Sequence, residues 1–253
     1  MRKNFLKLSA LAFLLLFALV SCEKHNVAKS KVAIRFKANG SAKVAAPEQS
    51  NAPSIFSGGL EVNSFKLNIA EIEFDLADDD ELVAEFNGTF SSDDEVKLRG
   101  PFEVDLLLNG ELQTQMLLNN LDIPIAKYEE IEFDLEKSKN AGSPLNGQSV
   151  RIEGSINNTP FVFSSDKRFD FEVEFNPPFT PDNNAGRVVI SFYVNTFFET
   201  IAANYDLAQV TPNADGVIVI TYNENDDKSN NYQLGKVIWD LMDDMFDCDD
   251  DDD

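Results

Sequence analysis

The chain of 253 residues contains few of the side chains from which catalytic and metal sites are most often built. It has one histidine and two cysteines, and its 21 basic residues stand against 44 acidic ones, which gives a formal charge of −23. One histidine cannot form a multi-histidine zinc site, and two cysteines cannot hold a zinc ribbon or an iron–sulfur cluster. The negative charge disfavours nucleic-acid binding, because that binding requires Lys and Arg to neutralise phosphates.

Enzyme motifs are missing as well. The sequence contains no Gly-x-Ser-x-Gly, no glycine-rich phosphate loop and no His-Glu-x-x-His motif. We therefore expect a protein that is not an enzyme, with no catalytic residue, no nucleic-acid partner and no cofactor, calcium being the alternative. A carboxylate-only hydrolase is the remaining enzymatic alternative, because a pair of carboxylates is sufficient to hydrolyse a glycoside.

What the sequence does contain begins with an export signal at residues 1–21. Three basic residues precede an apolar run that extends to Val20, a pattern typical of secretory signals and too short for a comfortable membrane span. The run ends in Leu-Val-Ser-Cys, which resembles the bacterial lipobox and predicts lipidation of Cys22, since a thiolate is the nucleophile that accepts the lipid. The alternatives are an ordinary cleavable signal with a chance cysteine, or an uncleaved anchor. The lipid would hold the mature protein at a membrane.

The remaining histidine and cysteine lie near the two ends of the chain. His25 falls in a polar tether, predicted over residues 22–30, and so close to the lipid that a catalytic role is not expected. Cys248 falls in an acidic tail predicted over 248–253, where a low thiol reactivity is the default. With Cys22 lipidated, no intramolecular disulfide is available, and stability must come from a packed core.

Alternation of apolar and polar residues predicts a mainly β chain over residues 31–228, with a flexible loop at about 38–59. The expected inward faces are Val32, Ile34, Phe36; Phe65, Leu67, Ile69; Ile72, Phe74, Leu76; Phe102, Val104, Leu106; Ile131, Phe133, Leu135; Val150, Ile152; Phe161, Phe163; and Phe169, Phe171, Val173, Phe175. The change of phase after Ile69 indicates a β-bulge. Residues 188–194 and 217–220 are apolar on both faces, as in central strands. Short strands separated by Asn, Gly and Pro predict an antiparallel β-sandwich.

Two helices are expected, a short one over 195–204 and a C-terminal amphipathic one over about 230–246, within the segment 229–247. The second has an apolar stripe with helical spacing, formed by Leu234, Val237, Ile238, Leu241, Met242 and Met245. Asn230 or Asn231 could cap its start. Its last turn is crowded with aspartates, which are unfavourable at the negative end of the helix dipole, so we expect that turn to fray.

An acidic strand pattern recurs along the chain. The hexapeptide EIEFDL occurs at 71–76 and again at 130–135, and the segments at 102–106 and 169–175 also alternate acids with apolar residues. Because like charges opposite each other destabilise a sheet, the simplest interpretation is that these strands are not neighbours, or sit on outer faces with Lys or Arg between them. Adaptation to high salt and binding of divalent cations are the alternatives. The calcium candidates are acids of two loops, Asp78, Asp79, Asp80, Glu81, Asp93 and Asp94.

Several segments together resemble a known group of proteins. The lipobox, the stretch LDIPIAKYEEIEFDL at 121–135 and the C-terminal segment from FYVNTFFETIA at 192–202 to the helix before the acidic tail are similar to uncharacterised Bacteroidota lipoproteins. The resemblance implies an outer-membrane lipoprotein, periplasmic or surface-exposed, with a transthyretin-like or carboxypeptidase-regulatory-like sandwich. The resemblance includes a Pro-x-x-x-Tyr element, here Pro124 and Tyr128, that leads the chain into the strand at Ile131.

These observations favour a lipid-anchored protein of the cell envelope with a non-enzymatic binding or structural role, its partners being the membrane and an envelope protein or glycan. The alternative is a calcium-dependent adhesion or glycan-binding module. In that case the acidic loops would hold calcium, and exposed aromatic side chains such as Tyr193, Tyr222 or Trp239 would meet the sugar.

Overall fold

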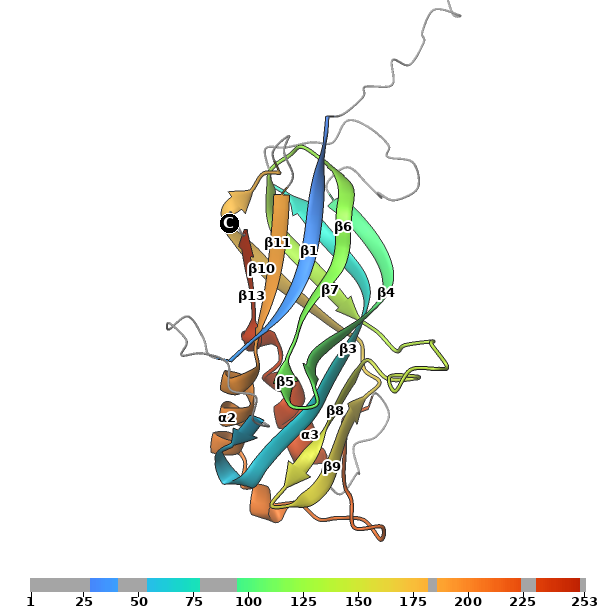
Figure 1. The fold of residues 1–253 in the computed structure, drawn as a ribbon, viewed down its shortest axis with the longest axis vertical. Coiled ribbons are helices and arrows are strands. Elements are labelled where there is room, and N and C mark those ends of the chain that lie inside the picture. Colours follow the sequence, from blue (N-terminus) through green and yellow to red (C-terminus); the bar gives the residue numbers. More distant parts are fainter. Residues whose placement is uncertain (1–27, 41–53, 78–94, 182–185, 224–230, 251–253) are drawn as a thin grey trace, which may run out of the picture.

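The computed structural model describes residues 28–40, 54–77, 95–181, 186–223 and 231–250. In this part the chain forms two β-sheets and two α-helices, which confirms the predicted mainly β sandwich with a short and a C-terminal helix (Figure 1). No helix among these residues is long and apolar enough to cross a membrane. The export signal, Cys22, His25 and the loop acids Asp78, Asp79, Asp80, Glu81, Asp93 and Asp94 lie outside the described residues.

The smaller sheet has the strand order β13-β11-β1-β6. It consists of β1 (Lys29–Asn39), β6 (Thr114–Pro124), β11 (Gly186–Tyr193) and β13 (Phe246–Asp250). The pairing of β1 with β11 is parallel, whereas β6 and β13 are antiparallel to their neighbours. The predicted inward face of β1 is confirmed, since Val32, Ile34 and Phe36 are buried.

The larger sheet has nine strands, with the path β10-β7-β3-β8-β9-β12. Its members are β2 (Ser54–Phe56), β3 (Leu60–Leu76), β4 (Glu95–Leu108), β5 (Glu111–Leu112), β7 (Tyr128–Leu135), β8 (Val150–Ile156), β9 (Thr159–Ser165), β10 (Phe169–Phe179) and β12 (Ile218–Thr221). All pairings are antiparallel except that of β12 with β9. The β8–β9 hairpin turns at Asn157 and Asn158, both with positive φ, as a two-residue type I′ turn requires.

Strand β3 runs through the whole molecule and changes partners on the way. One half pairs with β7 (Ile69 to Leu76), and the other half pairs with β8 (Leu60 to Leu67). The predicted bulge is confirmed, because the register with both β4 and β7 shifts between Ile69 and Glu71. The side chains before and after the bulge therefore all point inward, and Phe65, Leu67, Ile69, Ile72 and Phe74 have no exposed surface.

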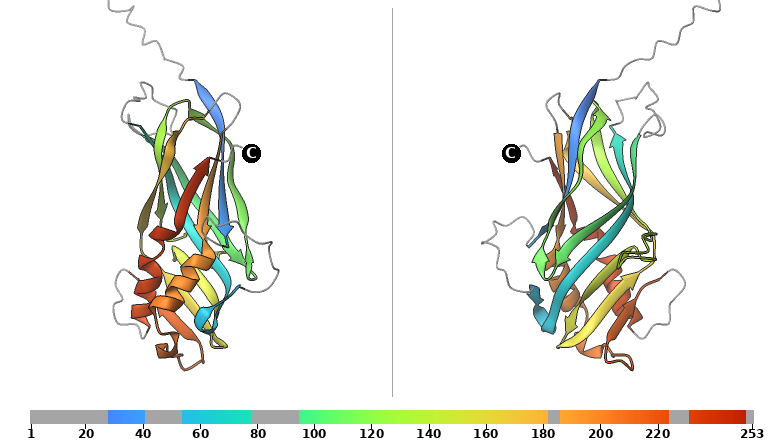
Figure 2. Two further views of the ribbon diagram at one scale, coloured as in Figure 1. Left: turned by 90° about the vertical axis from the view of Figure 1, so that its left-hand side faces the viewer. Right: turned by 45° about the vertical axis from the view of Figure 1, so that its right-hand side comes forward.

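The sandwich has a different second layer at each end. At one end the two sheets face each other, and at the other end helices α2 (Val194–Asn204) and α3 (Tyr232–Asp240) cover the larger sheet (Figure 2). Phe65 of β3 joins the two parts, since its ring lies 5.2 Å from that of Phe192 and 5.8 Å from that of Phe197. Aromatic pairs of this kind fill the space between layers more fully than aliphatic side chains do.

The Pro124–Tyr128 element that the resemblance pointed to forms a corner between β6 and β7. The buried Tyr128 hydroxyl donates a hydrogen bond of 3.0 Å to the carbonyl oxygen of Pro124, four residues upstream. The same device, a tyrosine bonded to the backbone upstream of its own strand, occurs at a corner of immunoglobulin-type sandwiches. Here it fixes the start of the second acidic strand.

The C-terminus differs from the prediction of a helix to residue 246 followed by an acidic tail. Helix α3 ends at Asp240, a 3₁₀ turn spans Asp243–Met245, and Phe246–Asp250 pair with β11 as strand β13. The reason is Phe246, whose ring stacks on Phe171 at 4.1 Å and meets Phe192 at 4.7 Å between the sheets. This burial outweighs continuation of a helix whose C-terminal aspartates oppose its dipole.

Four smaller expectations were wrong in part or in full. Residues 29–30, expected in the tether over 22–30, belong to β1, and residues 38–39 and 54–56, expected in the loop at 38–59, belong to β1 and β2. Residues 217–220 do not form a central strand, since β12 lies at the end of its sheet and Val219 is 40% exposed. Asn231 precedes α3 but does not cap it, because its buried side chain instead bonds the backbone of Thr211 and Val219.

Candidate functional site

The two copies of EIEFDL lie side by side. β3 pairs with β7, and β10 pairs with the other edge of β7, so that three acidic strands are adjacent, with β4 on the far side of β3. The apolar residues of these strands point inward, and their acids share the outer face. We call this surface the acidic face. Its three rows are Glu95, Asp75, Glu130, Glu174; Lys97, Glu73, Glu132, Glu172; and Arg99, Glu71, Asp134, Asp170.

The prediction that these strands are not neighbours is therefore wrong. The alternative prediction, that basic residues lie between the acids of an outer face, holds only at the two edges of the acidic face. Lys97 on β4 contacts Glu73 at 2.6 Å and Glu95 at 2.9 Å. Arg168, next to β10, contacts Asp134 at 2.6 Å and Asp170 at 2.9 Å. Packing of the apolar side on the core fixes the register, and a register shift of one residue would bury the charges.

Crowding changes the proton affinity of several of these acids. Burial raises the pKa of Glu130 to about 7, and the nearby charges of Glu172 and Asp75 add to the effect. Burial also raises the pKa of Glu132, again with help from the Glu172 charge. The acidic face therefore holds a carboxyl group, that of Glu130, which takes up a proton near neutral pH.

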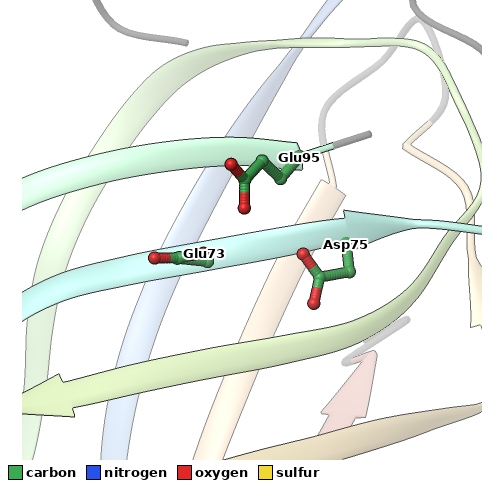
Figure 3. Close-up of side chains that lie close together, drawn as sticks. All are labelled: Glu73, Asp75 and Glu95. Carbon is green, nitrogen blue, oxygen red and sulfur yellow. The ribbon is translucent and has the colours of Figure 1, made fainter. Parts of the chain in front are cut away.

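At one end of the face, Glu73, Asp75 and Glu95 form a cluster in which one oxygen from each lies within 4.8 Å of the others (Figure 3). Burial raises the pKa of Glu73 to about 7, although the hydrogen bond from Lys97 opposes that shift. Burial and the Glu95 charge raise the pKa of Asp75. Three carboxylates at this spacing match the oxygen ligands that calcium prefers, but the Lys97 ammonium already contacts two of them.

At the other end of the face, Arg168 lies between two acids of adjacent strands. Burial and the hydrogen bond with Asp170 raise the pKa of Asp134 to about 6, and Arg168 opposes this. The same hydrogen bond lowers the pKa of Asp170. Arg168 therefore contacts both carboxyl groups, and Asp134 takes up a proton under mildly acidic conditions.

Beside this end the surface opens into a polar cleft of about 480 Å³. It lies where β3 changes partner from β7 to β8, with the bulge residue Ala70 and the Gly100–Pro101 segment of β4 in its wall. Its remaining lining residues are Asn68, Glu71, Arg99, Asp134, Glu136, Lys137, Lys139 and Arg168. The volume is in the range of small-molecule sites, and most of the described lining residues carry polar side chains.

Asn68 forms the inner wall of this cleft and is 2% exposed. Its backbone N–H donates to Ser149, and its Nδ2 donates to the Glu136 carbonyl oxygen at 2.7 Å. Its Oδ1 is buried and has no hydrogen-bond partner in the described part of the chain. Buried polar atoms are nearly always paired, so an unpaired acceptor on a residue that lines the cleft points to a donor that the described chain does not supply.

Another wall of the cleft is the segment between β7 and β8, residues 136–149, which Glu103 holds in place. Its carboxylate accepts hydrogen bonds of 2.7 Å from both Ser138 and Ser143. Glu103 was one of the strand acids that suggested cation binding, and the structure gives it this positioning role instead. Lys137 and Lys139 are carried on the segment that Glu103 holds.

The aromatic residues predicted to meet a sugar are not available as a platform. Tyr222 and Trp239 are buried and lie against each other with ring centres 5.9 Å apart. Tyr193 is partly buried and donates a hydrogen bond to Asp247 of β13. Sequence reasoning also missed Asn68, since a polar residue on the outer side of an alternating strand is what a solvated face would show.

Comparison with known proteins adds little. No protein-family model and no curated protein matches the chain. Among solved structures, MbnP from Methylosinus trichosporium is similar over 69% of this chain and 78% of its own, with 14% identity and a TM-score of 0.32. Such a distant likeness carries no argument about function. The resemblance to Bacteroidota lipoproteins stays a prediction.

Proposed function

We propose that the protein is a non-enzymatic binding protein of the cell envelope, anchored through Cys22, and that the cleft beside the acidic face is its binding site. The observation that carries the proposal is the buried, unpartnered Asn68 Oδ1 in the wall of a cleft of about 480 Å³. The described lining contains no histidine, cysteine or serine nucleophile.

The binding proposal is tested by filling the cleft without touching its polar groups. Ala70→Leu adds a side chain inside the cleft, and Ala203→Leu makes the same change on an exposed position of α2. Thermal melting against a panel of small polar solutes should identify at least one that stabilises the wild type and Ala203→Leu, because binding to the native state raises its stability. Ala70→Leu should not respond. An equal response from Ala70→Leu would place binding elsewhere, and no response from the wild type would contradict the proposal.

Calcium-dependent binding is the second candidate, and the Glu73–Asp75–Glu95 cluster favours it. Calcium would have to compete with Lys97, whose Nζ lies 2.6 Å from Glu73. Lys97→Met should therefore increase the stabilisation that calcium gives, whereas Lys236→Met, which removes an exposed lysine paired with Asp240, should not. A wild type and a Lys97→Met variant that both melt at the same temperature with and without calcium would exclude this candidate.

The anchor is tested separately. Cells that express the wild type or Cys248→Ser should incorporate labelled fatty acid into the protein, and cells that express Cys22→Ser should not, because the Cys22 thiol accepts the lipid. The unlabelled variant should also leave the membrane fraction. Equal labelling of the Cys22→Ser variant would refute the anchor without affecting the binding proposal.

A further inference from the structure

The chemistry of the cleft also restricts what it can bind. This inference rests on the proposed function and adds the class of ligand. Among the described lining residues, Ala70, Gly100 and Pro101 have no polar side-chain group, and the other eight do. A ligand that enters the cleft must pair with these polar groups, so the ligand is polar.

The inner wall demands a hydrogen-bond donor. The bond from Asn68 Nδ2 to the Glu136 carbonyl oxygen fixes the amide orientation, because the amide oxygen could not take that place next to another acceptor. Oδ1 is therefore the atom left without a partner in the described part of the protein. Only an N–H or O–H group can satisfy it.

The rim offers positive charge. Four basic side chains, Arg99, Lys137, Lys139 and Arg168, line the cleft against three acidic ones, in a chain whose acids otherwise outnumber its basic residues by more than two to one. Arg168 is fully engaged with Asp134 and Asp170, and Lys137 contacts Asp166. Arg99 bonds Glu71 only through Nε and is 83% exposed, and Lys139 makes no ion pair with the described residues.

We propose that the cleft binds a small hydroxylated anion with one acidic group, of the sugar-acid or hydroxyalkyl-phosphate class. A hydroxyl group of the ligand donates to Asn68 Oδ1, and its carboxylate or phosphate meets the free N–H groups of Arg99 and the ammonium of Lys139. A guanidinium suits such anions because it presents several N–H donors in one plane. The neighbouring acidic face repels ligands with several acidic groups, so the ligand carries one.

The test is calorimetric titration of the full mature chain with D-glucuronate, glycerol 3-phosphate, D-glucose and acetate. At least one of the two hydroxylated anions should bind about tenfold more tightly than both glucose, which lacks the charge, and acetate, which lacks the hydroxyl groups. Arg99→Gln combined with Lys139→Gln should weaken that binding about tenfold. Lys236→Gln, on the exposed side of α3, should not change it.

Site and ligand class can fail separately in this experiment. Equal binding of glucose and glucuronate, both abolished by Ala70→Leu, would overturn the anionic class and leave the cleft as a binding site. Anion binding that persists in Ala70→Leu would overturn both the proposal that the cleft is the binding site and the proposed ligand class. A shift of the Asn68 side-chain carbonyl signal in the NMR spectrum of asparagine-labelled protein should accompany binding of the anion, and an unchanged signal would also overturn the inference.

Discussion

At the scale of single residues, the surroundings of each acidic side chain decide whether it stabilises or destabilises the folded state. Glu103 accepts hydrogen bonds from two serine hydroxyls. Glu130 lies among like charges, opposite Asp75 on one side and Glu174 on the other. Carboxylates with donors stabilise the fold, and those facing other carboxylates destabilise it.

Replacing Glu130 by Gln should therefore stabilise the protein. At pH about 8 the change removes a charge opposed by like charges, and we expect a gain of roughly 0.5–1 kcal/mol in unfolding free energy. The gain should vanish near pH 5, where Glu130, with its pKa raised to about 7, is already protonated. Urea denaturation at both pH values measures it. Glu199→Gln, exposed on α2, is the matched control, and an equal effect there would contradict the account.

Replacing Lys97 by Met should have the opposite effect. The ammonium lies between Glu73 and Glu95 and is 23% exposed, so its removal leaves two close carboxylates without a counter-charge. We expect a loss of about 1–2 kcal/mol at pH about 8, in the range of hydrogen bonds to charged groups. Lys236→Met removes a surface pair with Asp240 and should cost far less. Equal losses in chemical denaturation would show that Lys97 has no special role.

At the scale of elements, the periodicity of the sequence predicts the strands that have one buried face. It does not predict the strands that form because of contacts between residues distant in the sequence. The bulge after Ile69 and the β8–β9 hairpin followed from local patterns. The strand Phe246–Asp250 could not be predicted from a local pattern, because its acids are typical of a solvated tail. It forms a strand because Phe246 packs on the rings of Phe171 and Phe192, which are distant in the sequence. Adjacency of β3 and β7, and with it the cleft, is likewise a property of topology, which no local pattern encodes.

Strand β13 should be necessary for stability. Removing residues 246–253 exposes the edge of β11 and deletes the Phe246 ring from the core, and we expect a loss of about 3–5 kcal/mol together with a tendency to associate through the open edge. Removing residues 251–253 alone should have little effect. Thermal melting and light scattering of the two truncated proteins measure the difference. Similar behaviour of both would show that β13 contributes nothing to the fold.

At the scale of the whole molecule, the acidic face makes stability depend on pH and salt. The pKa values of Glu73 and Glu130 are raised from an ordinary value of 4.5 to about 7, so the folded chain binds protons more tightly than the unfolded chain. Stability must then rise as pH falls through about 7 towards 4.5. We expect a higher melting temperature at pH about 5.5 than at about 8.

Salt should reduce that difference. Raising sodium chloride from about 0.1 M to about 1 M shortens the Debye length from about 10 Å to about 3 Å and screens the repulsion between charged carboxylates. Melting temperatures across pH and salt test this directly. A protein that is less stable at pH 5.5, or whose stability at pH 8 falls as salt increases, would contradict the description of the acidic face.

The central claim is that the cleft between β7 and β8 is a binding site, and its most direct test is the environment of Asn68 Oδ1. The measurement is an atomic-resolution crystal structure of the protein purified from its native cells without added solutes. The account predicts a bound organic molecule whose N–H or O–H group lies about 2.7–3.2 Å from Asn68 Oδ1 and whose opposite end reaches Arg99 or Lys139. An ordered water as the sole partner of Oδ1, with only solvent in the rest of the cleft, would contradict it.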